Sequence, residues 1–282
     1  MTIDRGARGR AARRARLARC ALVATGVAAF ALPSAAATFA DTIAQRVVAC
    51  TGCHGKEGRA APDGYYPRIA GKPAGYLFNQ LRNFRDERRH YELMNGLLAL
   101  LDDAYLREIA DHFASLDLPY PPPLAPVASA ALREAGEALV RRGDPGRGLP
   151  ACNDCHGAQM TGVAPSVPGL LGLPRDYLNA QLGAWRSGQR RALAPDCMAQ
   201  VAQRLSPEDI GAVSAWLAAQ PVPSHASAAA ASSAPLPMAC GGVAQSTADA
   251  STARRASPAA TAATAATAAT ASAPSTASKA PR

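Results

Sequence analysis

Two short segments of this sequence carry cysteine and histidine at a spacing that suits one particular chemistry. Cys50–His54 and Cys152–His156 both have the form Cys-x-x-Cys-His, and a glycine follows each of them. Two thiols three positions apart can form thioethers with the two vinyl groups of one porphyrin, and the adjacent histidine can bind the iron from the same side. The sequence therefore predicts two covalently attached haem c groups. The predicted attachment residues are Cys50, Cys53, Cys152 and Cys155, and the predicted proximal iron ligands are His54 and His156.

Other uses of paired cysteines fit this pattern poorly. A zinc ribbon places its two Cys-x-x-Cys pairs roughly 15–20 residues apart, whereas these two pairs are 102 residues apart. A redox-active dithiol would not explain a histidine after both pairs, and a disulfide within either motif would need unusually tight geometry. The spacing therefore favours haem over zinc or a dithiol.

The second axial ligand decides whether each iron is closed or open to other molecules. The chain has only five methionines, and two of them occupy matching places. Met94 lies 40 residues after His54, and Met198 lies 42 residues after His156. A thioether opposite histidine raises the reduction potential of a haem and occupies its sixth position. We therefore predict Met94 and Met198 as the distal iron ligands.

Neighbouring residues leave alternatives open on the distal side. His90 precedes Met94 by four residues and could give bis-histidine ligation, and a Cys197 thiolate could replace Met198. Cys197 could instead form a disulfide with Cys240 in an oxidising compartment. The sequence does not decide between these arrangements.

Further residues are expected around the iron ligands. Backbone carbonyls near Pro67 and Pro168 are expected to accept a hydrogen bond from the other ring nitrogen of His54 and of His156, which would fix the tautomer and plane of each ring. Arginines flank the helix predicted after each motif, and some of them are expected to pair with haem propionates. These arginines are Arg82, Arg85, Arg88, Arg186, Arg190 and Arg191.

The two motifs belong to a longer internal repeat, which indicates two copies of one domain. Leu77, Leu81 and Phe84 recur in equivalent form 101 residues later. Their i, i+4, i+7 spacing gives one apolar helix face. No alternation typical of strands is evident, so the predicted fold class is all-α.

Each copy is expected to contain three helices. The first runs into the cysteine motif, from about Thr42 in the first copy and from about Ala130 in the second. The second carries the apolar face described above. The third begins at 102–103 in the first copy and at Ser206 in the second. Ser206 is followed by a proline and, three positions on, by Asp209, which is a typical helix start.

The two ends of the chain differ in composition from its middle. An arginine-rich start, a short apolar run and small residues near Ala37 and Ala40 are typical of a cleaved export signal, with an uncleaved membrane anchor as the alternative. The last 62 residues consist mostly of Ala, Ser, Thr and Pro, and a segment with so little to bury is expected to be disordered. The predicted parts are a signal peptide over 1–40, a first haem domain over 41–118, a Pro-rich linker over 119–128, a second haem domain over 129–220 and a disordered tail over 221–282.

The formal net charge of +9 lies at the two ends of the chain. Residues 1–40 contribute +6 from seven arginines against one acidic residue, and residues 221–282 contribute +3 from four basic residues against one acidic residue. Residues 41–220 hold 19 basic and 19 acidic residues and are neutral. The folded part therefore lacks the basic excess typical of nucleic-acid binding.

These residues resemble the dihaem class I cytochromes c, the cytochrome c4-like family. The resemblance covers about 41–220. It rests, in the first copy, on Cys50–Gly55, Tyr66-Pro67, Gly71, Tyr76-Leu77, Gln80-Leu81, Phe84 and Met94. In the second copy it rests on Cys152–Gly157, Pro168–Leu170, Tyr177-Leu178, Gln181-Leu182 and Met198. The resemblance implies two tandem class I cytochrome c domains whose two haems lie close to each other.

The resemblance also implies a function in the periplasm, with peripheral membrane association left open. The expected role is a non-enzymatic electron carrier that takes electrons from a quinol-oxidising complex or a dehydrogenase. It would pass them to a terminal acceptor such as a haem-copper oxidase or a reductase. The alternatives are a haem subunit of a periplasmic dehydrogenase complex and a dihaem peroxidase. A peroxidase needs a vacant iron position, against which both methionines argue.

Overall fold

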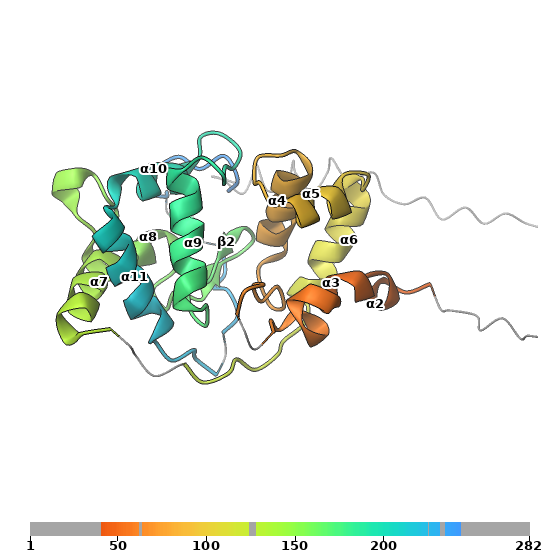
Figure 1. Ribbon diagram of the computed structural model, residues 1–282, viewed down its shortest axis with the longest axis horizontal. Helices are drawn as coiled ribbons and strands as arrows, with labels where there is room; N and C mark the ends of the chain where they lie inside the picture. The colour runs from red at the N-terminus through yellow and green to blue at the C-terminus, as the bar shows by residue number, and fades with distance from the viewer. Residues whose placement is uncertain (1–40, 62–63, 124–127, 225, 232–234, 244–282) are drawn as a thin grey trace, which may run out of the picture. The chain divides into compact units, whose positions relative to one another are not determined.

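The computed structural model describes residues 41–61, 64–123, 128–224, 226–231 and 235–243 (Figure 1). The predicted signal peptide and the part of the predicted tail after Val243 lie outside these residues. From Ile43 onward the chain forms one compact unit, which contains both copies of the repeat.

The first copy consists of five helices and one short 3₁₀ turn in its described residues. The second and third predicted helices are present as α4 and α6, and the first is divided in two by Val47. An additional short helix, α5, lies between α4 and α6. The elements are α2 (Ile43–Arg46), α3 (Val48–His54), the 3₁₀ turn η1 (Lys56–Gly58), α4 (Ala74–Arg85), α5 (Glu92–Leu98) and α6 (Asp103–Ala114).

The second copy repeats this order with a longer first helix. It also contains an additional short helix, α10, between the second and third predicted ones. The elements are α7 (Ala130–Arg142), η2 (Pro145–Arg147), α8 (Cys152–His156), β1 (Gly162–Val163), β2 (Val167–Pro168), α9 (Arg175–Arg186), α10 (Cys197–Arg204) and α11 (Pro207–Ala218).

One expectation about the first helices was wrong. In the second copy the helix from Ala130 does not run into the cysteine motif, because α7 ends at Arg142 and α8 begins only at Cys152. Gly143 follows α7 with φ 63°, and a β-carbon there would collide with the backbone of Leu149. The chain therefore turns back sharply at a position that only glycine tolerates well.

The fold is mostly helical, as predicted. Among the described residues, the only regular strands are β1 and β2, which pair antiparallel with Gly162 opposite Pro168 and Val163 opposite Val167. The sequence did not predict this small hairpin, because two-residue strands carry no alternation pattern. Its function in the fold is to position the backbone that follows the second cysteine motif.

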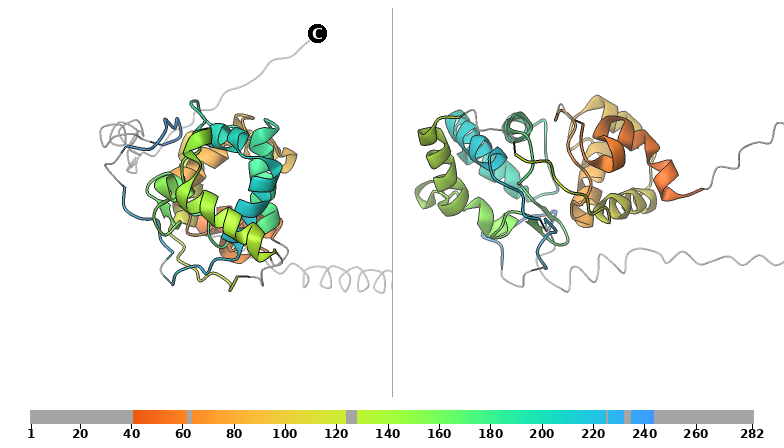
Figure 2. Two further views of the ribbon diagram at one scale, coloured as in Figure 1. Left: turned by 90° about the vertical axis from the view of Figure 1, so that its left-hand side faces the viewer. Right: turned by 90° about the horizontal axis from the view of Figure 1, so that it is seen from below.

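Each copy has its own apolar core. In the first, α4 packs against α6, and Leu106 and Phe113 are almost fully buried. In the second, α7 lies beside α11 (Figures 1 and 2), and Val140 packs with Trp216. A β-carbon at Gly136 of α7 would collide with the backbone of α11, so the two helices approach closely because this residue is glycine.

Part of the segment predicted as a disordered tail has a defined place. Ala229 pairs with the β1 strand, donating from its N–H to Gly162 O at 2.9 Å and accepting from Ala164 N at 2.8 Å. Cys240 is joined to Cys197 by a disulfide. Long-range contacts of this kind order a segment whose composition alone predicts disorder, so the described chain extends beyond residue 221 as far as Val243.

No helix in the described ranges is both long enough and apolar enough to span a bilayer. The predicted signal peptide over 1–40, and with it the alternative of an uncleaved anchor, lies outside those ranges.

Helix α11 begins where the sequence pattern predicted, with Ser206 as its N-terminal cap. Ser206 Oγ accepts from Asp209 N at 3.1 Å, and Asp209 Oδ2 accepts from Ser206 N at 2.8 Å, which forms the predicted capping box. We expect Ser206→Ala to lower the free energy of unfolding by about 1 kcal/mol, because it leaves a helical N–H without its acceptor. Denaturant unfolding followed by circular dichroism measures this loss, and Ser206→Thr should retain most of the stability. Equal losses in both variants would contradict the capping role.

Candidate haem-binding site

Both cysteine motifs border one large cavity of about 1310 Å³. His54 and Met94 line it from the first copy, and His156 and Met198 line it from the second. The residues predicted to ligate iron are therefore brought to one continuous space, although more than 100 residues separate the two motifs.

The proximal histidine of the first copy has a defined tautomer. His54 ends α3, is 8% exposed, and its Nδ1 lies 2.8 Å from Pro67 O. A carbonyl oxygen only accepts, so Nδ1 carries the proton and Nε2 keeps its lone pair. Burial lowers the pKa of His54, against the opposing effect of the Pro67 hydrogen bond, so the ring is neutral near neutral pH.

The second copy repeats this arrangement. His156 ends α8, and its Nδ1 donates to Pro168 O at 2.7 Å. Burial lowers the pKa of His156 as well. Pro168 belongs to β2, so the small hairpin holds the acceptor of this hydrogen bond. Both copies thus present a neutral imidazole with one nitrogen available to a metal.

Of the four motif cysteines, Cys53 is exposed and the other three are partly buried. Burial raises the pKa of Cys50 and of Cys155, and it raises the pKa of Cys152 to about 12. Cys53 is exposed and does not line the cavity, whereas Cys50, Cys152 and Cys155 do. No disulfide forms within either motif, and the described part of the chain contains no cluster of three or more His, Cys, Asp or Glu able to hold a metal.

The two candidate distal ligands lie on two short helices, α5 and α10, that were not expected from the sequence. Met94 is in α5 and Met198 is the second residue of α10, and both side chains are partly buried at the cavity wall. Of the two rivals, His90 is exposed at the cavity edge. Cys197 is in a disulfide and has no thiolate to offer.

A pair of arginines joins the two copies at the cavity. Arg89 and Arg190 form an isolated backbone bridge. Their side chains are shared between the copies, because Gln181 accepts from Arg89 at 2.6 Å and from Arg190 at 2.8 Å. Gln80 likewise accepts from Arg89 at 2.9 Å and from Arg190 at 3.1 Å. The two guanidinium groups therefore lie close together with neutral acceptors around them.

The charge of this pair fits an anionic cofactor. Within the described residues neither arginine has a carboxylate partner, and Arg190 is only 5% exposed. Burial, and after it the neighbouring Arg89, lowers the pKa of Arg190. Buried charge is costly without a counter-charge. Haem propionates would supply that counter-charge, so the residues present fit two haem groups. When bound, such groups supply one-electron redox couples at their irons.

Arg190 is one of the six arginines expected from the sequence to flank the haem sites, whereas Arg89 is not among them. The internal repeat does relate these two arginines to each other. Arg89 and Arg190 are 101 residues apart, which is also the offset between Gln80 and Gln181. Repeat symmetry alone does not indicate that two equivalent residues meet. Only the packing of one copy against the other brings them together.

Several known proteins are similar to this chain. A thiosulfate dehydrogenase electron acceptor of Thiomonas intermedia (strain K12) is 39% identical over 181 residues, which cover 64% of this chain and 82% of that protein. A cytochrome c4 of Pseudomonas aeruginosa is 34% identical over 174 residues, covering 61% of this chain and 84% of that protein. The chain belongs to the cytochrome c4 family of dihaem c-type cytochromes. No family model matches it.

Solved structures agree with this membership. Reduced recombinant cytochrome c4 from Pseudomonas stutzeri has a TM-score of 0.52 at 31% identity, covering 61% of this chain and 94% of that one. Thiosulfate dehydrogenase (TsdBA) from Marichromatium purpuratum has a TM-score of 0.55 at 33% identity, covering 61% of this chain but only 36% of that longer one. As a member of the cytochrome c4 family, the protein carries two covalently bound haem c groups and transfers electrons.

The arginine pair generates a prediction about the reduction potentials. A positive charge near a haem stabilises its reduced form, so Arg190→Gln should lower the potential of at least one haem by an amount on the order of 50 mV. Potentiometric titration of the holoprotein measures this shift. Arg142→Gln removes the same charge from an exposed position outside the cavity, where water screens it, and should change little. Equal shifts in both variants would show that the position at the cavity is unimportant.

Proposed function

We propose that this protein is the electron acceptor of a periplasmic thiosulfate-oxidising dehydrogenase and passes the electrons to a terminal oxidase or reductase. Two relatives support this donor. Besides the Thiomonas protein, a thiosulfate dehydrogenase electron acceptor of Stutzerimonas stutzeri (strain A1501) is 36% identical over 172 residues. The similarity to part of the structure of thiosulfate dehydrogenase (TsdBA) points the same way.

The proposed role is that of a carrier and not of an enzyme. In the proposed site, Cys50 and Cys53 hold the first haem, with His54 and Met94 as its axial ligands. An equivalent set holds the second haem: Cys152, Cys155, His156 and Met198. With both axial positions occupied by protein side chains, neither iron has a place for a substrate. Pro67 and Pro168 hold the histidine rings in place by accepting from Nδ1.

One observation carries the proposal: a single cavity is bordered by both pairs of candidate axial ligands, His54 with Met94 and His156 with Met198. Two cofactors in one continuous space lie near each other, which favours electron passage between them. Arg89 and Arg190, held together by Gln80 and Gln181, lie at the wall of this space. The cavity therefore supports entry of an electron at one haem and exit from the other.

We further propose that the protein works in the periplasm after removal of the predicted signal peptide. The Cys197–Cys240 disulfide supports this location, because such bonds persist in oxidising compartments and are rare in the cytosol.

If Met94 and Met198 are the distal ligands, replacing either one should affect one haem only. Met94→Ala and Met198→Ala should each remove half of the red charge-transfer band of methionine-ligated ferric haem. Each should also lower one reduction potential by an amount on the order of 100 mV, because the thioether stabilises the reduced iron. Absorption and electron paramagnetic resonance spectra of the oxidised holoprotein measure the first effect, and potentiometry measures the second.

His90→Ala is the matched control for the first haem. It should leave the spectra of both haems unchanged, because His90 is exposed at the cavity edge. If His90→Ala changes the first haem and Met94→Ala does not, the bis-histidine arrangement is the correct one.

The donor assignment predicts rapid reduction by one partner. A purified thiosulfate dehydrogenase, supplied with thiosulfate, should reduce both haems of this protein in stopped-flow experiments. The rate should fall with rising ionic strength if local charges guide the encounter. Reduction no faster than that of an unrelated monohaem cytochrome c would refute this donor.

A second candidate is a general respiratory carrier fed by a quinol-oxidising complex. The relatives named cytochrome c4 favour it. Fast reduction by quinol-oxidising membranes, together with slow reduction by the dehydrogenase, would identify this role.

A further inference from the structure

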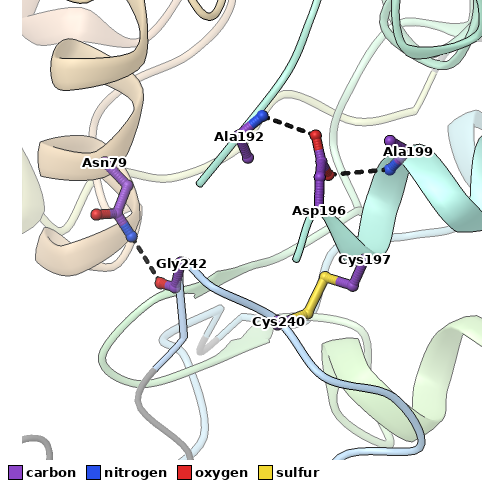
Figure 3. Close-up of a disulfide and its surroundings, with 7 residues drawn as sticks. All are labelled: Asn79, Ala192, Asp196, Cys197, Ala199, Cys240 and Gly242. Carbon is purple, nitrogen blue, oxygen red and sulfur yellow. Dashed lines mark hydrogen bonds between the residues drawn. A yellow bond between two sulfur atoms is a disulfide. The ribbon is translucent and has the colours of Figure 1, made fainter. Parts of the chain in front are cut away.

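A segment near the end of the described chain is joined by a disulfide to Cys197 at the start of α10 (Figure 3). Cys240 forms a disulfide with Cys197, which directly precedes Met198 and lies 43 residues earlier in the chain than Cys240. We call residues 235–243 the strap. Five of its residues line the large cavity together with Met198: Leu236, Met238, Cys240, Gly242 and Val243.

The strap is attached at two further points. Gly241 N donates to Pro195 O at 2.9 Å, and Asn79 Nδ2 on α4 donates to Gly242 O at 2.7 Å (Figure 3). A β-carbon on Gly241 would collide with the backbone of Ala194. The backbone of the strap therefore packs directly against the backbone at Ala194. These contacts tie the strap to both copies of the repeat and place the disulfide firmly at the start of α10.

Few other contacts among the described residues hold the start of α10. The helix has eight residues, of which only Ala202 is fully buried, and a helix this short is not stable on its own. Asp196 caps it, accepting from Ala199 N at 3.0 Å and from Ala192 N at 2.7 Å. Among the described residues, the start of α10, and with it Met198, is held by the Asp196 carboxylate and by the covalent bond through Cys197, while the rest of the helix packs against α9.

In the first copy, the segment around Met94 is held by hydrogen bonds and not by a covalent bond. Met94 is followed by Asn95, whose Oδ1 accepts from Tyr91 N at 2.7 Å and whose Nδ2 donates to the backbone oxygens of Phe84 and Arg89. Three hydrogen bonds from one side chain thus hold the segment around Met94. The two copies differ in the chemistry that fixes their candidate distal ligands.

We propose that the Cys197–Cys240 disulfide is a positioning device that keeps Met198 on the iron of the second haem. This inference rests on the ligand assignment under the proposed function. Without the bond, the start of α10 opens more often, so Met198 leaves the iron more often. The second haem then becomes accessible to added ligands and its potential falls, while the first haem is unaffected.

The test compares the holoprotein with the double variant Cys197→Ser/Cys240→Ser, which leaves no free thiol to bind iron. Imidazole binding to the second ferric haem should become about tenfold faster, because binding requires prior departure of Met198. In nuclear magnetic resonance spectra of the reduced protein, the methyl signal of iron-bound Met198 should broaden or shift, and that of Met94 should not. Asn95→Ala is the matched control and should produce the same changes at the first haem only.

Two outcomes separate this inference from the ligand assignment. If Met198→Ala abolishes its methyl signal but the double serine variant leaves both the signal and the imidazole rate unchanged, the positioning role is wrong and the ligand stands. If Met198→Ala leaves the signal intact, the ligand assignment fails, and the positioning role fails with it.

A second measurement applies if the double variant does not fold with both haems. In the folded holoprotein, a water-soluble phosphine reduces the S–S bond to two thiols, its own phosphorus taking oxygen from water, and iodoacetamide then blocks both thiols. After reoxidation of the haems with ferricyanide, imidazole binding should again accelerate at the second haem only. An unchanged rate in the blocked protein would overturn the proposal.

Discussion

The rest of the structure depends on one hydrogen bond that occurs twice, from the Nδ1–H of a motif histidine to the backbone carbonyl oxygen of a proline that lines the same cavity. His54 makes it to Pro67 and His156 makes it to Pro168. Each bond fixes a ring at the end of a short helix and leaves Nε2 as the nitrogen that would bind a haem iron. The helices α4 and α9 then supply an apolar wall, and α6 and α11 close each core behind it. A domain of this size has little apolar surface of its own, so a covalently attached haem is part of its core.

Duplication has not made the two halves equivalent. Around Met94 the backbone is held by hydrogen bonds from Asn95, whereas around Met198 it is held by Asp196 and a disulfide from a distant segment. Hydrogen bonds re-form quickly after local opening, while a disulfide limits the opening itself. Two haems in nearly the same fold can in this way differ in potential and in ligand exchange, which gives an electron a preferred direction through a dihaem protein.

The charged residues are also unevenly distributed along the chain and within the fold. The ends of the chain carry the formal excess of +9, and residues 41–220 are neutral. Inside that neutral part, Arg89 and Arg190 meet at the cavity wall with amide and hydroxyl acceptors but no described carboxylate partner. The arrangement concentrates positive potential beside the redox centres, where it favours the reduced state and where low dielectric strengthens it. The net charge of the chain therefore says little about the electrostatics that matter for electron transfer.

The sequence by itself determined what depends on local spacing. The two Cys-x-x-Cys-His motifs predicted the haems, the i, i+4, i+7 pattern predicted α4 and α9, and Ser206 with Asp209 predicted the start of α11, because each signal lies within a few residues of its effect. Tertiary structure decided the rest. The short helices α5 and α10 have too few residues to be stable alone, so packing defines them. The meeting of Arg89 with Arg190, and the strap that returns to Cys197 from 43 residues away, join segments whose contact no local pattern encodes.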